Sequence, residues 1–187
     1  MAKITVRILV ESDWQLYRAA RLRALQESPT FFTARLADEA AQGEQFWRDR
    51  MIQSVRLVAE RQGRSEGIAS LAGAADDPET AEIFGLYVVP EARSTGVSWR
   101  LTEAAAALAS QQGFQQLFYW VGIDNARAIA FAKNFGFRST DYRRPSRAAD
   151  LDLGDQEAAM VLPLVFDDTS VPNPTSGRPI PKAGALG

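Results

Sequence analysis

The segment Arg93-Ser94-Thr95-Gly96-Val97-Ser98 has the residue types and spacing that suit anion binding. We expect it to join a strand to a helix, so that several backbone N–H groups point to one place where the helix dipole favours negative charge. Gly96 lets the backbone approach a ligand because it has no Cβ, and Arg93 adds a charged donor. The segment is no P-loop, since no Gly-Lys-Ser/Thr follows. It predicts a cradle for a pyrophosphate, and a plain helix start is the alternative interpretation.

Cysteine and histidine are both absent from the 187 residues. This excludes disulfide scaffolds, thiol nucleophiles, Ser–His and Cys–His pairs, and metal sites built on Cys or His. Any proton transfer must therefore use Glu, Asp, Tyr, Lys or water. We expect no metal.

The charge and hydropathy exclude two further classes. The net charge is −2, whereas a non-specific nucleic-acid binder is strongly basic, so no nucleic-acid partner is expected. The longest apolar runs, such as 117–121 and 160–165, are far shorter than the roughly 20 residues that span a bilayer. No secretory signal pattern opens the chain, which favours a cytoplasmic protein without membrane contact.

The elements that must position the loop follow from hydropathy periods and turn residues. Ser12 and Gln15 predict a capping box for a first helix that ends at Ser28-Pro29. Gly113 and Gly136 are expected to end two later helices, and Asp124 or Asn125 to cap the second of these. The predicted strands are 3–10, 55–60, 68–74, 81–89, 117–121, 137–144 and 157–164, and the predicted helices are 14–28, 36–51, 98–112 and 125–136.

This order predicts an α/β (α+β) fold with one mixed, seven-stranded sheet and about four helices on its two faces. The continuous apolar run 117–121 indicates a strand covered on both faces. We expect one domain over 1–166. Residues 167–187, with four Pro and three Gly, form a predicted C-terminal tail.

Two motifs in this order resemble the GNAT superfamily of acyl-CoA-dependent N-acyltransferases. The segment 93–98 is similar to the family's Arg/Gln-x-x-Gly-x-Gly/Ala loop, with Ser98 at the last position. Asn125-Ala126-Arg127-Ala128, then Phe131 and Gly136-Phe137, resembles the second motif. The resemblance covers about 3–164, and the chain is similar to bacterial members of the family. It implies a mostly antiparallel sheet whose fourth and fifth strands pair in parallel.

The resemblance also implies acetyl-CoA, or another acyl-CoA, as co-substrate. The backbone of Tyr87, Val88 and Val89 would pair with the pantetheine arm. Asn125 would touch the pantetheine or the acyl end, and Lys133 or Arg100 would reach a phosphate. The residues implied for cofactor binding are Tyr87, Val88, Val89, Arg93, Ser94, Thr95, Gly96, Val97, Ser98, Asn125, Ala128, Phe131 and Lys133.

Of the catalytic residues that the resemblance implies, the base is present and the acid is missing. The family's frequent general base is a glutamate eleven positions before the loop motif, and that position is Glu82. The family's frequent acid is a tyrosine where this chain has Phe131, which cannot donate a proton. Tyr119, Tyr142 or water would then protonate the leaving thiolate, or it leaves unassisted.

The acceptor is expected to be a primary amine. Asp38, Glu39 and Glu44 would attract a cationic amine, with an exposed helix face as the alternative interpretation. The arginines at 138, 143, 144 and 147 lie near the acids at 150, 152 and 155, and either neutralise them or bind an anionic substrate. A homodimer is common in this family.

Two other functions stay open. Phe131 and Ser98 both permit a catalytically weak CoA-binding module that acts as a sensor. The same fold could also take its acyl group from a donor other than CoA, such as an acyl carrier protein, because fold alone does not fix function.

Overall fold

A computed structural model describes residues 2–29, 32, 34–146 and 156–164. Its elements are β1 (Thr5–Ile8), α1 (Trp14–Glu27), α2 (Leu36–Ala40), α3 (Glu44–Gln53), β2 (Val55–Arg61), β3 (Arg64–Gly73), β4 (Thr80–Val88), α4 (Val97–Gln111), β5 (Gln116–Gly122), α5 (Ala126–Phe135), β6 (Arg138–Pro145) and β7 (Gln156–Pro163). Short 3-10 turns at Glu11–Asp13 and Pro90–Ala92 precede α1 and α4. The predicted strand and helix order is confirmed except between β1 and β2, where the structure has three helices instead of the predicted two.

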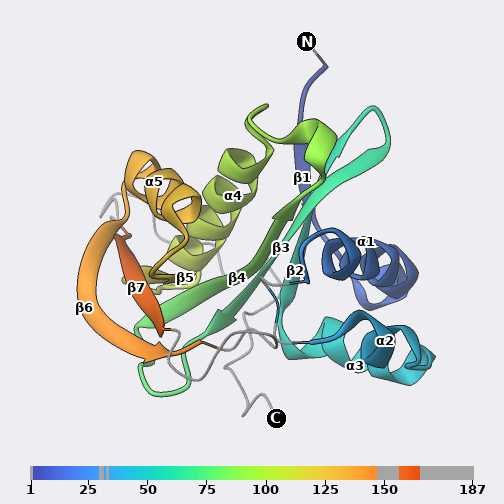
Figure 1. Ribbon diagram of the computed structural model, residues 1–187, viewed down its shortest axis with the longest axis horizontal. Coiled ribbons are helices and arrows are strands. Elements are labelled where there is room, and N and C mark those ends of the chain that lie inside the picture. Colours follow the sequence, from blue (N-terminus) through green and yellow to red (C-terminus); the bar gives the residue numbers. More distant parts are fainter. Residues whose placement is uncertain (1, 30–31, 33, 147–155, 165–187) are drawn as a thin grey trace.

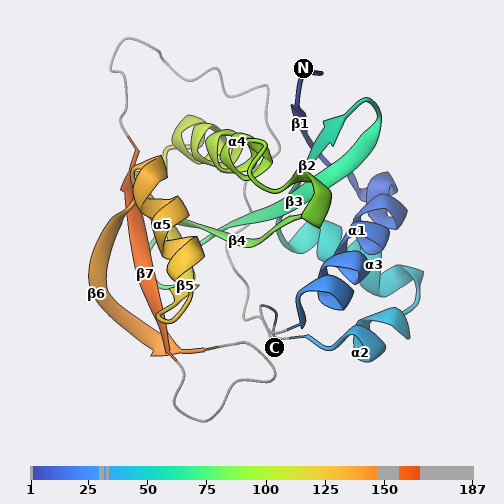
Figure 2. The ribbon, with the colours of Figure 1, turned by 45° about the horizontal axis from the view of Figure 1, so that its top comes forward.

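The seven strands form one sheet in the order β1-β2-β3-β4-β5-β7-β6. Every neighbouring pair is antiparallel except β4 and β5, which run in parallel. The mixed sheet with a central parallel pair is therefore confirmed. Figures 1 and 2 show α1, α2 and α3 together on one side of the sheet and α4 on the other.

The α4 side holds much of the core. Leu101, Ala105 and Ala109 are fully buried at helical spacing on α4, and Leu71 and Ile83 are fully buried on β3 and β4. This spacing is why the sequence pattern located α4 correctly. None of the helices in the described ranges has the length and hydropathy needed to cross a membrane.

The start of α1 differs from the prediction. Ser12 lies within the 3-10 turn, and α1 begins at Trp14 without a side-chain cap, so the predicted Ser12–Gln15 capping box is wrong. The Asp13 carboxylate accepts the Val10 N–H at 2.9 Å and lies 3.0 Å from Arg7 Nη1. These contacts stabilise a tight turn before the helix.

The predicted helix over 36–51 is two helices. The first, α2, ends at Ala40, and Gly43 begins α3 as an extended N-cap residue with ψ 178°. Glycine is one of the residues favoured at the N-cap, so α3 starts here as a new helix and α2 does not continue. The break lets α2 and α3 take different directions over the sheet (Figure 1).

The hairpin between β2 and β3 is tighter than predicted. Its turn is Gln62-Gly63, both with positive φ (52° and 73°), instead of a longer loop over 61–66. The arginine and aspartate positions 147, 150, 152 and 155, and the predicted tail 167–187, lie outside the described residues.

Candidate functional site

The parallel pair β4–β5 opens in its second half. Thr80 to Ile83 pair with Gln116 to Tyr119, and beyond Ile83 the two strands no longer pair. Opposite β3, Ser70 pairs with Phe84 and Ile68 with Tyr87, so β4 contains one extra residue between them. Gly85 lies in this bulge with φ +60°, in the left-handed region that favours glycine. The bulge bends β4 and leaves its backbone beyond Ile83 unpaired toward β5.

The loop 93–98 connects the end of β4 to α4. Gly96 is the N-cap of α4 with φ 93°, and Ser94 also has positive φ (63°). Thr95 Oγ1 accepts from Arg61 Nη2 at 2.9 Å and donates to the Ala92 carbonyl at 2.7 Å. These contacts from β2 and the 3-10 turn fix the loop in one conformation.

Among the described residues, the backbone amides of Gly96, Val97 and Ser98 have no hydrogen-bond acceptor. They lie at the N-terminus of a 15-residue helix, where the dipole favours an anion. The loop therefore presents backbone donors at a helix N-terminus, an arrangement that can bind an anion. The predicted pyrophosphate cradle stays a prediction.

At the end of β4, the backbone groups of successive residues point alternately toward β3 and toward the opening. The Val89 N–H donates to the Glu66 carbonyl at 2.9 Å, so that amide is turned toward β3. The Val88 carbonyl accepts Arg93 Nε at 3.2 Å and is turned the other way. Because carbonyl and N–H of one strand residue point to the same side, the Val88 N–H also faces the opening. Among the backbone N–H groups of Tyr87, Val88 and Val89, that of Val88 is therefore the one that faces the opening.

The Tyr87 side chain is directed to α1. Its hydroxyl donates to the Glu27 carboxylate. Burial and this carboxylate raise the pKa of Tyr87. Its phenol is therefore held away from the opening. By the same alternation, its backbone N–H and C=O are turned toward Ile68 of β3.

The second predicted motif starts α5. Asn125 caps the helix, and its side-chain oxygen accepts the Ala128 N–H at 3.0 Å. Phe131 is partly buried with its ring 6.2 Å from that of Phe135. Lys133 is exposed and forms no ion pair with a described residue.

Trp99, near the start of α4, also reaches Phe135. The two ring centroids are 4.6 Å apart, and Trp99 is 42% exposed. The pair thus connects the loop helix α4 to α5 by an aromatic contact. Packing between the two helices therefore explains why a residue as large as tryptophan stands at this position.

Glu82 lies on the sheet face that α1 and α3 flank. Its Oε1 accepts from Trp120 Nε1 at 3.1 Å, and its Oε2 lies 4.0 Å from Arg144 Nη1. The Arg144 guanidinium stacks 4.2 Å from the Trp120 ring centre and donates to Glu157 Oε2 at 2.6 Å. With 26% of its side chain exposed, Glu82 is held in position and still open to solvent.

The two tyrosines predicted as alternative acids lie on opposite faces. Tyr142 is 63% exposed and its ring lies 6.1 Å from that of Phe118, the register partner of Glu82. Tyr119 pairs with Ile83 and packs against Phe137 on the other face. Burial raises the pKa of Tyr119 to about 12. Only Tyr142 shares the face of Glu82.

The strand β5 is less covered than its composition suggested. Leu117 and Val121 are buried, but Phe118, Tyr119 and Trp120 are partly exposed. The prediction of a strand covered on both faces is therefore wrong. The Phe118 and Trp120 side chains line the open face beside Glu82 instead of a second core.

The three acids predicted to attract an amine have different surroundings. Glu39 is buried and paired with Arg21 and Arg50, so it is not a free carboxylate at the surface. Glu44 pairs with Arg48 on the exposed face of α3, as the alternative interpretation expected. Asp38 is exposed.

Sequence reasoning missed Trp120 and Arg56. It assigned Arg144 to the acids at 150, 152 and 155 or to an anionic substrate, whereas among the described residues Arg144 contacts Glu157 and Glu82. The sequence alone could not have indicated Trp120, because its approach to Glu82 depends on the register of β4 with β5, in which Phe118 is opposite Glu82 and Trp120 follows on the same face. The sequence could not have placed Arg144 at Glu82, since this contact joins strands distant in the chain. The partners of Arg56 are near in the chain, but an arginine predicts exposure, whereas packing buries this one.

The model of the acetyltransferase (GNAT) family matches residues 18–137. Two curated relatives match a shorter part. An uncharacterized N-acetyltransferase of Methanocaldococcus jannaschii is 35% identical over 63 residues, which are 34% of this chain and 28% of that protein. Mycothiol acetyltransferase of Kocuria rhizophila is 31% identical over 65 residues, 35% of this chain and 22% of that protein. The matched region thus spans about a quarter of these relatives.

Solved structures match nearly the whole chain. The structure of yncA from Salmonella typhimurium with its cofactor acetyl-CoA has a TM-score of 0.69 at 20% identity, covering 92% of this chain and 99% of that one. The ribosomal-protein-S18-alanine N-acetyltransferase of Escherichia coli has a TM-score of 0.62 at 20% identity, covering 90% and 99%. At these identities the structures show a shared fold. Together with the family match over more than half of the sequence, they show that the chain belongs to the acetyltransferase (GNAT) family.

Proposed function

We propose that this protein transfers an acetyl or related acyl group from an acyl-CoA to a primary amine, with Glu82 accepting the amine proton directly or through water. The observation that carries the proposal is the juxtaposition of two features. The β4–β5 opening and the free amides of the loop 93–98 lie at one end of β4, and Glu82 lies earlier on the same strand, just before the strands separate.

The residues around the opening fit a CoA thioester. Gly96, Val97 and Ser98 offer unpaired amides for the pyrophosphate, with Arg93 beside them. The Val88 N–H is the open backbone donor for the pantetheine arm. Ala128 and Phe131 on α5 would line the other side, with Asn125 at its start. Lys133 and Arg100 are exposed cations that could reach a phosphate.

Bound there, an acyl-CoA would supply a thioester carbonyl activated for attack by an amine. The bulged segment 86–88 carries the backbone N–H groups that could donate to the carbonyl oxygen as it gains charge. Holding amine and thioester in one orientation accounts for much of the rate enhancement in such a site.

The amine must lose a proton before it attacks, since an alkylamine has a pKa of about 10.4. Glu82 is the carboxylate on the face beside the opening with one oxygen held by Trp120. Its partial exposure leaves room for a water between carboxylate and amine.

The departing thiolate needs less help. A thiol has an ordinary pKa of about 8.5, so it leaves without full protonation near neutral pH. Phe131 donates no proton, and Tyr142 is the exposed phenol on the Glu82 face. Water or Tyr142 therefore serves as proton donor.

Phe131 also supports a second candidate, a CoA-binding module with weak or no catalysis. A donor other than CoA is a third, and it predicts weak binding of free acetyl-CoA.

The test is release of free thiol from acetyl-CoA in the presence of a panel of primary amines. We expect amine-dependent turnover, with kcat reduced about 10²- to 10⁴-fold in Glu82→Gln, as for loss of a general base. Glu79→Gln is the control, because Glu79 is exposed just before β4 and contacts Gln115. Binding of acetyl-CoA without turnover on any amine would support the module instead. Full activity of Glu82→Gln would show that another group accepts the proton.

A further inference from the structure

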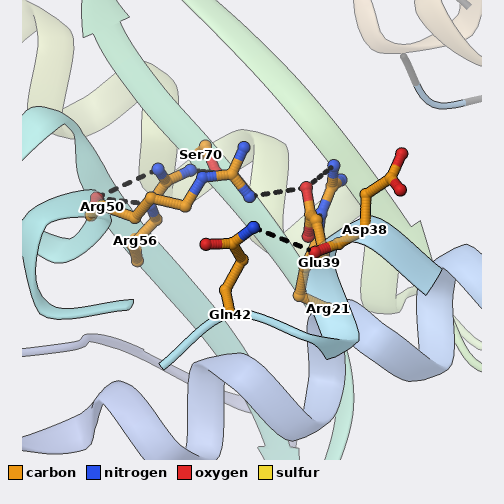
Figure 3. A network of polar contacts seen from close by, with 7 residues as sticks. All are labelled: Arg21, Asp38, Glu39, Gln42, Arg50, Arg56 and Ser70. Atoms are coloured by element: carbon orange, nitrogen blue, oxygen red, sulfur yellow. Dashed lines mark hydrogen bonds and ion pairs between the residues drawn. The ribbon is translucent and has the colours of Figure 1, made fainter. Parts of the chain in front are cut away.

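A buried guanidinium lies beneath the face that carries Glu82. Arg56 on β2 is 5% exposed. Its Nε and Nη2 donate to the Arg50 carbonyl at 3.2 and 3.0 Å, and its Nη1 donates to Ser70 Oγ (Figure 3). It forms no ion pair with a described residue. Burial lowers its pKa, as expected for a cation removed from water.

The charges around Arg56 do not balance. Both oxygens of Glu39 are occupied, by Arg21 Nε and Nη2 at 3.0 Å each and by Arg50 Nη1 at 2.7 Å. Glu39 is the one carboxylate that these contacts include, against the three guanidinium groups of Arg21, Arg50 and Arg56. Buried charges in proteins are normally paired, because an unpaired one loses its hydration without compensation.

The end of α3 compensates only part of this excess. The Arg50 carbonyl belongs to the last turn of α3, where the helix dipole places roughly half a negative charge. Tyr17 and Phe84 add ring faces, 4.7 and 5.8 Å from the Arg56 guanidinium. The arginine cluster of Arg21, Arg50 and Arg56 therefore keeps a net positive charge.

Arg50 is the member of the cluster that is partly exposed, whereas Arg21 and Arg56 are buried. Arg50 has 26% of its side chain exposed, and its Nε and Nη2 have no acceptor among the described residues. Ser70, which accepts from Arg56, lies two residues before Ala72, and Ala72 is the register partner of Glu82. Two residues along a strand are roughly 7 Å, on the same face.

We infer that the acceptor of this protein is an amine that also carries a carboxylate, and that Arg50 binds this carboxylate, above the buried charge of Arg56, while the amine lies at Glu82. The inference rests on the proposed function for the position of the amine. The guanidinium fork suits the two oxygens of a carboxylate, and the bound anion supplies the negative charge that the cluster lacks.

The experiment compares amino acids with their carboxamides as acceptors, at saturating acetyl-CoA. The two differ in the carboxylate and keep the amine. We expect kcat/KM for the best amino acid to exceed that of its amide by about 10- to 100-fold, the range for a lost hydrogen bond to a charged group. In Arg50→Gln this ratio falls to less than about 3-fold.

The matched control is Arg48→Gln. Arg48 is on the same helix and pairs with Glu44 and Glu11 on the exposed side, so this variant keeps the wild-type ratio. Arg56→Gln is a second variant that removes the buried charge beneath Arg50, and it lowers the ratio as well. Thermal unfolding followed by circular dichroism identifies any variant that fails to fold; Arg50, being partly exposed, is the variant expected to fold.

The outcomes separate the two proposals. Equal kcat/KM for amino acids and amides in the wild type overturns the carboxylate site and leaves the acyl transfer standing. No transfer to any amine overturns the proposed function, and calorimetric titration with the amino acids and amides in the presence of CoA then decides. The site is supported if an amino acid binds at least 10-fold more tightly than its amide and this difference disappears in Arg50→Gln. Equal binding of the two, or no binding of either, contradicts it.

Discussion

The indole N–H of Trp120 donates to Oε1 of Glu82 over 3.1 Å, across the last part of the sheet in which β4 and β5 are still paired. A residue of β5 therefore orients the carboxylate of β4 at the point where the opening begins. Arg144 of β6 lies 4.0 Å from the other oxygen, and Glu157 of β7 holds Arg144 in place. The position of the proposed base depends on four strands.

Trp120→Phe tests this orientation. The phenyl ring keeps the stacking surface for Arg144 but has no N–H, so we expect kcat to fall about 10-fold or more while KM for acetyl-CoA is unchanged. Steady-state kinetics with a saturating amine measure both. Trp14→Phe on α1, remote from β5, is the control, and an unaltered kcat in Trp120→Phe would show that this hydrogen bond does not serve catalysis.

Gly96→Ala tests the anion cradle. A side chain at φ +93° costs roughly 1–2 kcal/mol, and relief of this strain displaces the loop amides, so we expect the Kd for CoA to rise about 5- to 30-fold. Gly113→Ala is a matched control, because Gly113 has φ +87° beyond the opposite end of α4, with open space around it. Both variants lose stability, and only Gly96→Ala loses affinity. Equal affinities in calorimetry would remove the loop from the CoA site.

Phe131→Tyr tests the missing acid. The added hydroxyl on α5 gives the leaving thiolate a proton donor, and we expect kcat to rise, by no more than the roughly 10²- to 10⁴-fold that a general acid contributes. Phe135→Tyr, one turn further along α5, is the control. The rate of the acetyl-transfer step in single-turnover experiments is the measurement. A rate that does not increase would mean that thiolate departure is already assisted or is not limiting.

Glu39→Gln tests the buried ion pairs. Burial raises the pKa of Glu39, but hydrogen bonds and charges from Arg21 and Arg50 outweigh it and hold the pKa below its ordinary value. The stabilisation is therefore present above the unfolded-state pKa, about 4.3, and is lost as the pH falls through the lower folded-state value.

We expect Glu39→Gln to lower the free energy of unfolding at pH 7 by about 3–5 kcal/mol and to flatten its dependence on pH between about 5 and 2. Urea unfolding across this range measures both. Glu44→Gln removes an exposed pair with Arg48 and should cost less than about 1 kcal/mol. A pH dependence as steep as that of the wild type would show that Glu39 does not contribute to acid sensitivity.

The local features of the fold were predictable from the sequence because they depend on neighbouring residues. Gly136 ends α5 with φ 119°, and Asn125 caps it, as the residue types indicated. The break at Gly43 was not predicted, since the apolar pattern continues through Phe46 and Trp47 into α3. Periodicity identified the helical character but not the change of direction.

The loop 93–98 and the position of Glu82 on β4 could be inferred from motif spacing. The partners of Glu82 could not, because they come from β5, β6 and β7, whose register is set by pairing between distant segments. The pairing of Glu39 with Arg21 and Arg50 has the same origin. A glutamate on a short helix is expected to be exposed, whereas tertiary packing buries Glu39.

Calorimetric titration of the purified protein with acetyl-CoA, with free CoA as reference, is the most direct test of the central claim that the β4–β5 opening and the loop 93–98 hold an acyl-CoA. We predict one binding site per chain with a Kd in the micromolar range, about −8 kcal/mol. Absence of heat with both ligands at millimolar concentration would contradict the acyl-CoA site, and with it the proposed transferase.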